Sequence, residues 1–202
     1  MRAKRPTNKT HQDTGRLRII GGQWRGRVLT FPNVDGLRPT GDRIRETLFN
    51  WLMGYTAEAR CLDLFAGSGA LSLEALSRGA SEAYAIELDK RAAQTIRHHG
   101  ATLGTQALKV YSDDTLALLT RGNPWTPFDI VFIDPPFSAE LAGPCATLLE
   151  QGGWLAEQAW IYVEADRRLP TPEVPEHWQA YREKTAGQVV YTLYRRTTSQ
   201  EA

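Results

Sequence analysis

The sequence predicts an α/β fold built on a mostly parallel β-sheet. From residue 61 onward, short apolar runs alternate with segments of helical periodicity, the pattern of β–α–β units joined by right-handed crossovers. A glycine-rich turn follows the first of these runs, as in sheets that bind nucleotide-like ligands. The 202 residues, 42% of them hydrophobic, are enough for one large domain, or for one domain and an arm.

The N-terminal part of the chain differs from the rest in composition. Residues 1–15 show no apolar periodicity and are expected to form a disordered basic tail. Residues 16–40 are expected to form a hairpin arm with one apolar and one basic side, turning near Gly21 and Gly22. Trp24 lies among the arginines of this arm, either as an anchor for the hairpin or as a surface for base stacking, and anchoring is preferred.

The remaining chain, residues 41–202, is expected to form the main domain. Apolar residues at helical spacing predict a helix across residues 44–52. The expected strands are 61–65, 83–87, 107–111, 128–133 and 159–163; the expected helices between them are 70–77, 91–98, 115–119 and 139–150; a closing hairpin is expected from 177–184 and 189–196.

The histidines and cysteines point to no metal site. His98 and His99 fall on a helix away from the strand ends, and both are expected on the surface. Cys61 and Cys145 have no ligand-like spacing to each other or to a histidine, so they are expected to be buried small residues in a reduced setting. No apolar run approaches the length that crosses a membrane, and the first residues do not resemble a secretory signal.

The glycine-rich turn predicts a cofactor site. It lacks the third glycine of the dinucleotide fingerprint, since Ser72 stands there, and the strand before it carries Asp63. A carboxylate so close to the turn disfavours a pyrophosphate and favours a cation. S-adenosyl-L-methionine carries a sulfonium and an amino group, and glycines let such a ligand approach the backbone closely. A dehydrogenase is therefore disfavoured.

Acids at the ends of the next two strands extend this site. Glu87 ends the second strand, where a carboxylate can take both ribose hydroxyls. Asp113 and Asp114 follow the third strand; Asp114 is preferred as acceptor for the adenine amino group, and the alternative is that it caps a helix. The predicted cofactor residues are Asp63, Phe65, Ala66, Gly67, Ser68, Gly69, Glu87, Leu88 and Asp114.

The fourth strand leads into Asp134-Pro135-Pro136-Phe137, the predicted catalytic segment. Proline cannot continue a central strand, and each proline restricts its own backbone and that of its predecessor. The segment therefore holds a carboxylate, a carbonyl and an aromatic face rigidly at the carboxyl edge of the sheet. Asp134 and the Pro135 carbonyl can accept the two N–H groups of an amine on a nucleobase, and Phe137 can stack on the base. The alternative is an ordinary turn.

Charge is unevenly distributed along the chain. The net charge is +1, but residues 1–48 carry +7 and the remainder carries −6. A basic arm on a mildly acidic domain indicates a polyanionic partner, and the alternative is a merely solvated tail. The predicted RNA-binding residues are Arg18, Trp24, Arg25, Arg27, Arg38 and Arg43.

From about Arg16 onward, the chain resembles the ribosomal RNA small subunit methyltransferase D family. The resemblance rests on 18–27 (RIIGGQWRGR), 37–40 (LRPT), 43–52 (RIRETLFNWL), 63–69 (DLFAGSG) and 134–137 (DPPF). The glycine turn and DPPF occur in many amino-methyltransferases, whereas the N-terminal blocks are specific to this family. Phe137 stands where related enzymes often carry tyrosine, which removes a hydroxyl and keeps the stacking face.

The resemblance implies a Rossmann-like class I fold with a seven-stranded sheet and S-adenosyl-L-methionine as methyl donor. It also implies methylation of the N2 amine of guanine 966 in 16S rRNA, within the 30S subunit or an assembly intermediate. A cytoplasmic monomer is expected. Two alternatives stay open: an adenine-N6 or cytosine-N4 methyltransferase, because these amines need the same geometry, and a non-catalytic RNA-binding assembly factor.

Overall fold

The computed structural model describes residues 14–32, 41–136 and 140–197. Its elements, in chain order, are β1 (Thr14–Arg18), β2 (Val28–Pro32), α1 (Asp42–Trp51), β3 (Arg60–Asp63), α2 (Ala70–Ser77), β4 (Glu82–Ile86), α3 (Lys90–Thr102), β5 (Leu108–Tyr111), α4 (Thr115–Thr120), β6 (Phe128–Ile133), α5 (Ala142–Gln151), β7 (Leu155–Asp166), β8 (Trp178–Ala186) and β9 (Val189–Arg196).

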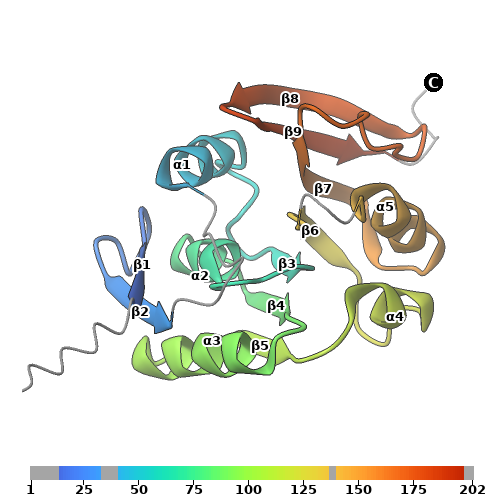
Figure 1. Ribbon diagram of the computed structural model, residues 1–202. Helices are drawn as coiled ribbons and strands as arrows, with labels where there is room; N and C mark the ends of the chain where they lie inside the picture. The colour runs from blue at the N-terminus through green and yellow to red at the C-terminus, as the bar shows by residue number, and fades with distance from the viewer. Residues whose placement is uncertain (1–13, 33–40, 137–139, 198–202) are drawn as a thin grey trace, which may run out of the picture.

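The centre of the molecule is a seven-stranded sheet in the order β5-β4-β3-β6-β7-β9-β8 (Figure 1). Strands β3 to β7 run parallel, β9 pairs antiparallel with β7, and β8 pairs antiparallel with β9. The predicted α/β fold, with its mostly parallel sheet and closing hairpin, is confirmed. Because the order reverses between β3 and β6, the carboxyl ends of these two strands border the crevice in which such sheets bind ligands.

Helices cover both faces of the sheet. On one face, α1 and α2 bury residues such as Leu48, Phe49 and Leu76 against Phe132 and Tyr162. On the other face, α4 and α5 enclose a second apolar cluster around Trp154. Strand side chains alternate between the two clusters, which explains why the central strands are almost continuously apolar. Cys61 and Cys145 are buried, as predicted.

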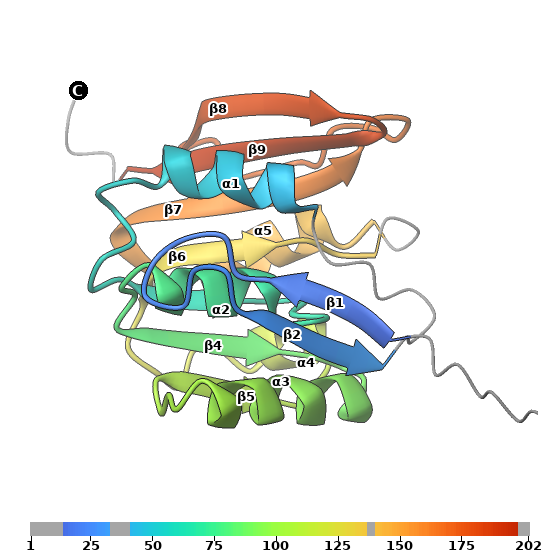
Figure 2. The same ribbon diagram turned by 90° about the vertical axis from the view of Figure 1, so that its left-hand side faces the viewer.

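The strands β1 and β2 form a separate two-stranded sheet that packs on α2 and α3 (Figure 2). Its apolar side chains pack against Ala70 and Leu73 of α2; they are Leu17, Ile19, Leu29 and Phe31. The turn of the arm approaches the end of α2 so closely that a Cβ on Gly22 would lie 1.7 Å from the Ser77 carbonyl oxygen. With φ at +75°, this position accepts only glycine.

The docked arm corrects the prediction for His99. His98 is exposed, as expected, but His99 is buried, and its ring Nε2 hydrogen-bonds the Thr30 carbonyl of β2 at 3.0 Å. The prediction failed because nothing in the local pattern shows that a distant segment covers this turn of α3.

Two elements near the site differ from their predicted ranges. Helix α5 begins at Ala142 rather than at residue 139, which places Pro144 in the first turn, where its missing N–H has no intrahelical partner to lose. Strand β7 extends from Leu155 to Asp166, well beyond the predicted 159–163. Its extension carries two further acids, Glu164 and Asp166, to the carboxyl edge of the sheet. Within the described ranges, no helix is long and apolar enough to cross a membrane.

Candidate functional site

The predicted site residues converge on the carboxyl edge of the parallel strands. Asp63 is the last residue of β3, Glu87 follows β4, Asp114 follows β5 and Asp134 follows β6. Backbone hydrogen bonds continue across this edge, from Ala66 N–H to the Ile86 carbonyl and from Glu87 N–H to the Tyr111 carbonyl. The edge is therefore rigid, and it presents a row of carboxyl groups.

The turn from β3 to α2 has the backbone that its glycines predict. Gly67 and Gly69 have φ values of +54° and +80°, in the region that disfavours other residues. Gly69 also packs tightly, since a Cβ there would lie 3.1 Å from Ile96. Ala66 and Ser68 are buried, and Phe65 is half-buried against the core cluster below α4. The turn thus exposes backbone rather than side chains to a ligand.

Asp63 is almost wholly buried beneath this turn. One oxygen, Oδ2, accepts hydrogen bonds from the Ser72 hydroxyl at 2.7 Å and from the Ser72 N–H at 3.3 Å. Burial raises the pKa of Asp63 to about 7, with the charges of Asp134 and Glu87 adding to the effect. Ser72, which stands where a dinucleotide binder has glycine, therefore holds the carboxyl group in place.

Two buried polar atoms beside the turn suit a cationic ligand. Among the described residues, no donor reaches Asp63 Oδ1 and no partner reaches Ser68 Oγ, although both atoms are buried. Buried polar atoms are rarely left without hydrogen bonds, and such exceptions often mark a ligand site. An acceptor and a hydroxyl group beside a glycine turn suit the amino and sulfonium end of S-adenosyl-L-methionine.

Glu87 is held with its carboxyl group toward the turn. Its Oε2 accepts from Gly67 N–H and its Oε1 accepts from Asp89 N–H, both at 2.7 Å. Partial burial raises its pKa. These contacts fix the carboxylate between β4 and the glycine turn, where a ribose is expected. The neighbouring Leu88 is exposed and offers an apolar surface.

The two acids after β5 have partners of their own. Asp114 caps α4, its Oδ1 accepting from Ala117 N–H at 2.8 Å, which is the alternative role recognised from the sequence. Asp113 pairs with Arg121. Asp114 nevertheless remains exposed at the edge, so its capping role leaves it accessible to an adenine.

The predicted catalytic segment lies directly across from Asp63. Asp134 is half-buried, Pro135 is buried and Pro136 is exposed. Phe137 lies outside the described residues. A cavity of about 470 Å³ opens beside the two prolines, between α5 and the end of β7; it is large enough for a nucleobase.

Glu164 and Tyr162 were not predicted from the sequence. Both side chains lie on the same face of β7, beside Asp134 at the end of the neighbouring strand β6. Tyr162 donates to Glu164 Oε1 at 2.7 Å. Burial raises the pKa of Glu164 well above its usual value, and the neighbouring Asp134 raises it further. A charged residue ending an otherwise apolar strand beside the DPPF strand was the signal that could have found it.

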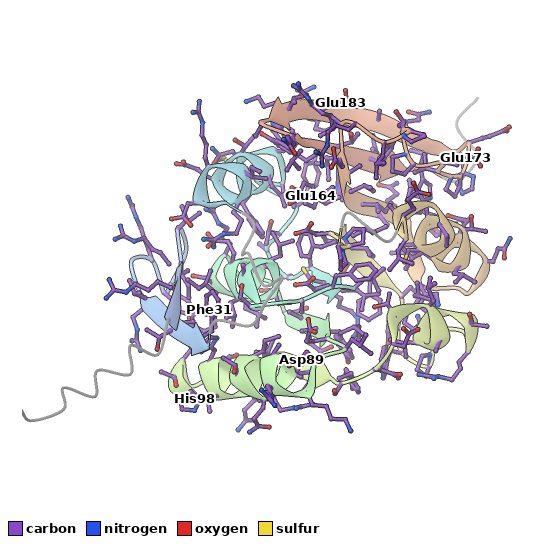
Figure 3. All side chains as sticks on the ribbon, viewed as in Figure 1. Phe31, Asp89, His98, Glu164, Glu173 and Glu183 are labelled. Atoms are coloured by element: carbon purple, nitrogen blue, oxygen red, sulfur yellow. The ribbon has the colours of Figure 1, made fainter. Side chains whose placement is uncertain are left out.

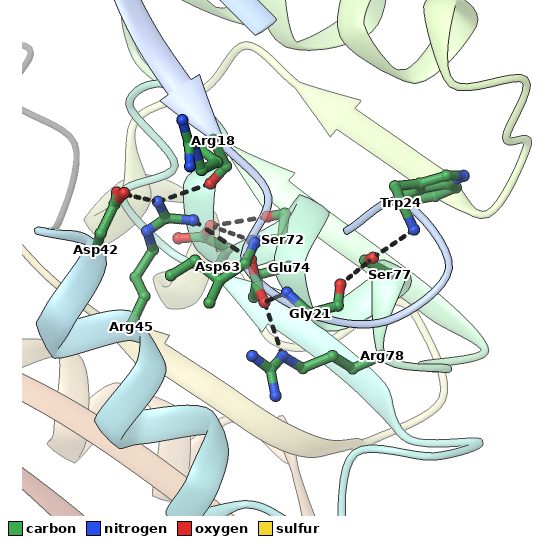
Figure 4. Close-up of polar contacts among 11 residues, drawn as sticks. Arg18, Gly21, Trp24, Asp42, Arg45, Asp63, Ser72, Glu74, Ser77 and Arg78 are labelled. Carbon is green, nitrogen blue, oxygen red and sulfur yellow. Dashed lines mark hydrogen bonds and ion pairs between the residues drawn. The ribbon is translucent and has the colours of Figure 1, made fainter. Parts of the chain in front are cut away.

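The arm is attached through a buried ion pair that the sequence did not reveal (Figure 4). Glu74 of α2, fully buried, accepts from the N–H groups of Ile20 and Gly21, each at 2.8 Å, and from Arg78 Nε at 2.7 Å. Arg45 of α1, also fully buried, lies 3.4 Å from Glu74 and donates to the Arg18 carbonyl at 2.9 Å. The single glutamate in the otherwise uncharged segment of α2 was the signal in the sequence that could have revealed this ion pair.

The predicted RNA-binding residues do not form one cluster. Arg18 is exposed at the end of β1 and Arg43 is exposed in the first turn of α1, whereas Arg25 and Arg27 lie in the turn of the arm, which contacts Ser77 at the end of α2. Trp24 is half-buried between two apolar clusters, which favours its anchoring role. Arg38 lies outside the described residues.

Comparisons with known proteins agree with this arrangement. The model of the family described as "Conserved hypothetical protein 95" matches residues 17–195. Ribosomal RNA small subunit methyltransferase D of Escherichia coli (strain K12) is 50% identical over 192 residues, covering 95% of this chain and 96% of that protein.

Solved structures show the same fold. A putative methyltransferase of Escherichia coli, yhhF, superposes with a TM-score of 0.83 at 48% identity, covering 92% of this chain and 100% of the other. A putative methyltransferase solved in complex with SAH, SMU.776, has a TM-score of 0.67 at 16% identity, covering 84% of this chain and 54% of the other; at that identity it shows the fold alone. The Rossmann-like class I methyltransferase fold is thereby confirmed, and the chain belongs to the ribosomal RNA small subunit methyltransferase D family.

Proposed function

We propose that this protein methylates the N2 amine of a guanine in 16S rRNA, at the position that the family numbers 966. The coarser activity follows from family membership: the protein is an rRNA methyltransferase that uses S-adenosyl-L-methionine. We further propose that it acts as a cytoplasmic monomer on the 30S subunit or an assembly intermediate. The observation that carries the proposal is that Asp134 and the glycine turn share one edge of the sheet.

The residues of the site suit transfer of a methyl group to an aromatic amine. S-adenosyl-L-methionine supplies, when bound, an electrophilic methyl group on a positively charged sulfur. Such an amine is a poor nucleophile while its lone pair is shared with the ring. Asp134 and the Pro135 carbonyl accept its two N–H bonds and turn the lone pair out of the ring plane. Most of the catalytic effect is therefore positioning.

Asp134 also acts on the charge that develops during the reaction. The amine nitrogen becomes positive as its new bond forms, so the carboxylate stabilises the transition state more than the ground state. Asp134 then receives the proton that the amine loses. The guanine must be unstacked to reach Asp134, because a stacked and paired base hides this edge. The cavity beside Pro135 and Pro136 offers room for the unstacked base.

Transfer of tritiated methyl groups to three acceptors tests the proposal. The acceptors are 30S subunits lacking the modification, naked 16S rRNA and duplex DNA. We expect label in the 30S subunits, recovered as N2-methylguanine after digestion. Label only in DNA, as N6-methyladenine or N4-methylcytosine, would contradict the proposal. Binding of the cofactor with no transfer to any acceptor would favour an assembly factor.

The raised pKa of Asp63 predicts that cofactor binding depends on pH. An ionised Asp63 favours a cationic ligand, and below about pH 7 the ligand-free protein must first release a proton. The Kd for S-adenosyl-L-methionine should therefore increase as the pH falls below 7, by up to about tenfold per pH unit. Calorimetry in two buffers of different ionisation enthalpy measures the released proton. Asp63→Asn should bind weakly at pH 8 and release no proton there or at pH 6; a pH dependence that survives this substitution would contradict the role.

The exposed arginines of the arm predict salt-dependent RNA binding. Replacing both Arg25 and Arg27 by alanine removes two cations from the turn, and each phosphate contact contributes about 0.7 to 0.9 to the slope of log K against log salt. We expect weaker binding of 16S rRNA and a slope lower by about 1.4 to 1.8. The matched control replaces Arg182 and Lys184, exposed on β8 at the far edge of the sheet. Equal effects from both pairs would argue against a specific role for the arm.

A further inference from the structure

The catalytic carboxylate has a buried carboxyl neighbour that the proposed reaction does not yet use. Ile133 of β6 pairs with Val163 of β7, so the next residues, Asp134 and Glu164, lie side by side at the carboxyl edge, close enough for their carboxyl groups to hydrogen-bond. Only 4% of Glu164 is exposed. In the view of Figure 3 it lies in the interior, beside α1, whereas the acidic side chain of Glu183 lies on the outer hairpin.

Two carboxylates in contact within a buried site cannot both be ionised without strong repulsion. A hydrogen bond between two carboxyl groups also requires that one of them carries the proton. Tyr162 donates to Glu164 Oε1, and Glu164 in turn lies against Asp134. The three groups therefore form a directed chain from the Tyr162 hydroxyl to Glu164 and on to Asp134.

We propose that Glu164 is a positioning residue that stays protonated and donates a hydrogen bond to the Asp134 carboxylate. This proposal rests on the proposed methyl transfer at Asp134. The bond fixes the orientation of Asp134, so that its remaining lone pairs face the amine of the bound base. Asp134 carries the negative charge of the pair. The proton of Glu164 forms the hydrogen bond that fixes the Asp134 carboxylate in position.

The surroundings of Glu164 support the neutral state. Burial and the neighbouring Asp134 both disfavour a negative charge on Glu164, and together they outweigh the hydrogen bond from Tyr162, which favours it. Tyr191 of β9 is its register partner and contributes a further hydroxyl to this region. The buried cation of α1, Arg45, is engaged by Glu74 and Asp42, and the Arg168 cation is engaged by Asp166.

Replacing Glu164 by glutamine and by alanine separates positioning from a structural role. The amide of glutamine can donate to Asp134 and still accept from Tyr162, whereas alanine can do neither. We expect Glu164→Ala to reduce kcat by at least tenfold with little change in KM for RNA, and Glu164→Gln to recover most of that loss at neutral pH. The kcat of the wild type should fall as the pH rises through the raised pKa of Glu164, and Glu164→Gln should lack that decrease.

A second readout needs no activity. Because the folded pKa of Glu164 is raised above its unfolded value, its proton stabilises the fold at low pH, and that contribution is lost as pH rises. The stability of the wild type, relative to Glu164→Gln, should therefore decrease as pH rises above about 4.5 in urea titrations. Glu183→Gln is the matched control, since Glu183 is exposed and contacts Thr192 on the outer hairpin; it should match the wild type in both readouts.

Two outcomes would overturn the proposal. One is a Glu164→Gln enzyme as inactive as Glu164→Ala, which would show that Glu164 acts through its charge. The other is unchanged pH dependence of both kcat and stability in Glu164→Gln. Failure of the wild type to methylate RNA would instead refute the proposed function, and the stability titration would still decide whether Glu164 holds the proton of the pair.

Discussion

Replacing Asp134 by alanine is expected to reduce kcat by about 10² to 10⁴, the range typical of a group that accepts a proton in the transition state. Alanine removes the acceptor that orients the amine and the base that takes its proton. The Kd for S-adenosyl-L-methionine should stay close to that of the wild type, because the glycine turn, Asp63 and Glu87 remain in place. Single-turnover transfer to 30S subunits, together with calorimetry of cofactor binding, measures both quantities.

A pair of asparagine substitutions on the same strand tests whether position at the edge matters. Asp134→Asn keeps an oxygen that can accept from the amine but no longer accepts the proton, so its kcat should lie between those of the wild type and Asp134→Ala. Asp129→Asn changes the opposite end of β6, where Asp129 accepts from the Arg60 N–H, and should leave kcat unchanged. A turnover for Asp134→Ala near that of the wild type would remove Asp134 from the mechanism.

Replacing Glu74 by leucine is expected to lower the free energy of unfolding by about 3–5 kcal/mol, the usual effect of breaking a buried ion pair. The substitution leaves Arg45 without its buried counter-ion and leaves the N–H groups of Ile20 and Gly21 without acceptors. The arm should detach from α2 as a result. Urea denaturation measures the stability, and trypsin cleavage after Arg25 and Arg27 measures detachment of the arm.

Two further variants define the origin of that loss. The double variant Arg45→Met, Glu74→Leu removes both charges and should recover part of the stability, because the buried Arg45 cation is removed together with Glu74. Glu82→Ala breaks a partly exposed pair with Arg60 and should cost no more than about 1 kcal/mol. If Glu74→Leu loses no more stability than Glu82→Ala, the buried network does not hold the arm.

Features that depend on neighbouring residues were predictable from the sequence. The glycine turn, the strand end at Asp63 and the proline stop after Asp134 follow from local backbone chemistry, and all lie where the alternation of strands and helices places them. Parallel strands share a carboxyl edge, so the acids after three of them were expected to meet. The helix cap at Asp114 was recognisable for the same local reason.

Features that depend on contacts between distant segments were not predictable. Arg45 lies off the apolar stripe of α1, yet it is fully buried, because the arm and Glu74 close over it. His99 was wrongly expected on the surface, because its sequence neighbours do not show that β2 of the arm covers it. The residues before Glu164 in β7 are buried on both faces of the sheet, so their periodicity could not show on which face Glu164 lies. In each case the missing information was the position of a partner far away in the chain.

The placement of the arm sets a minimum size for the RNA that can use the whole surface. The turn of the arm contacts Ser77 at the end of α2, so it lies beside the amino ends of the strands, while Asp134 lies at their carboxyl ends. The six residues of β6, at about 3.3 Å each, put about 20 Å between these two levels.

One strand of a nucleic acid helix advances about 3.4 Å per phosphate, so a substrate that touches both levels must extend over about six nucleotides. A free nucleotide or a very short oligonucleotide can occupy the reactive edge without reaching Arg25 and Arg27. On the RNA-binding role proposed for the arm, only a guanine within a longer RNA can engage the reactive edge while that RNA also contacts Arg25 and Arg27.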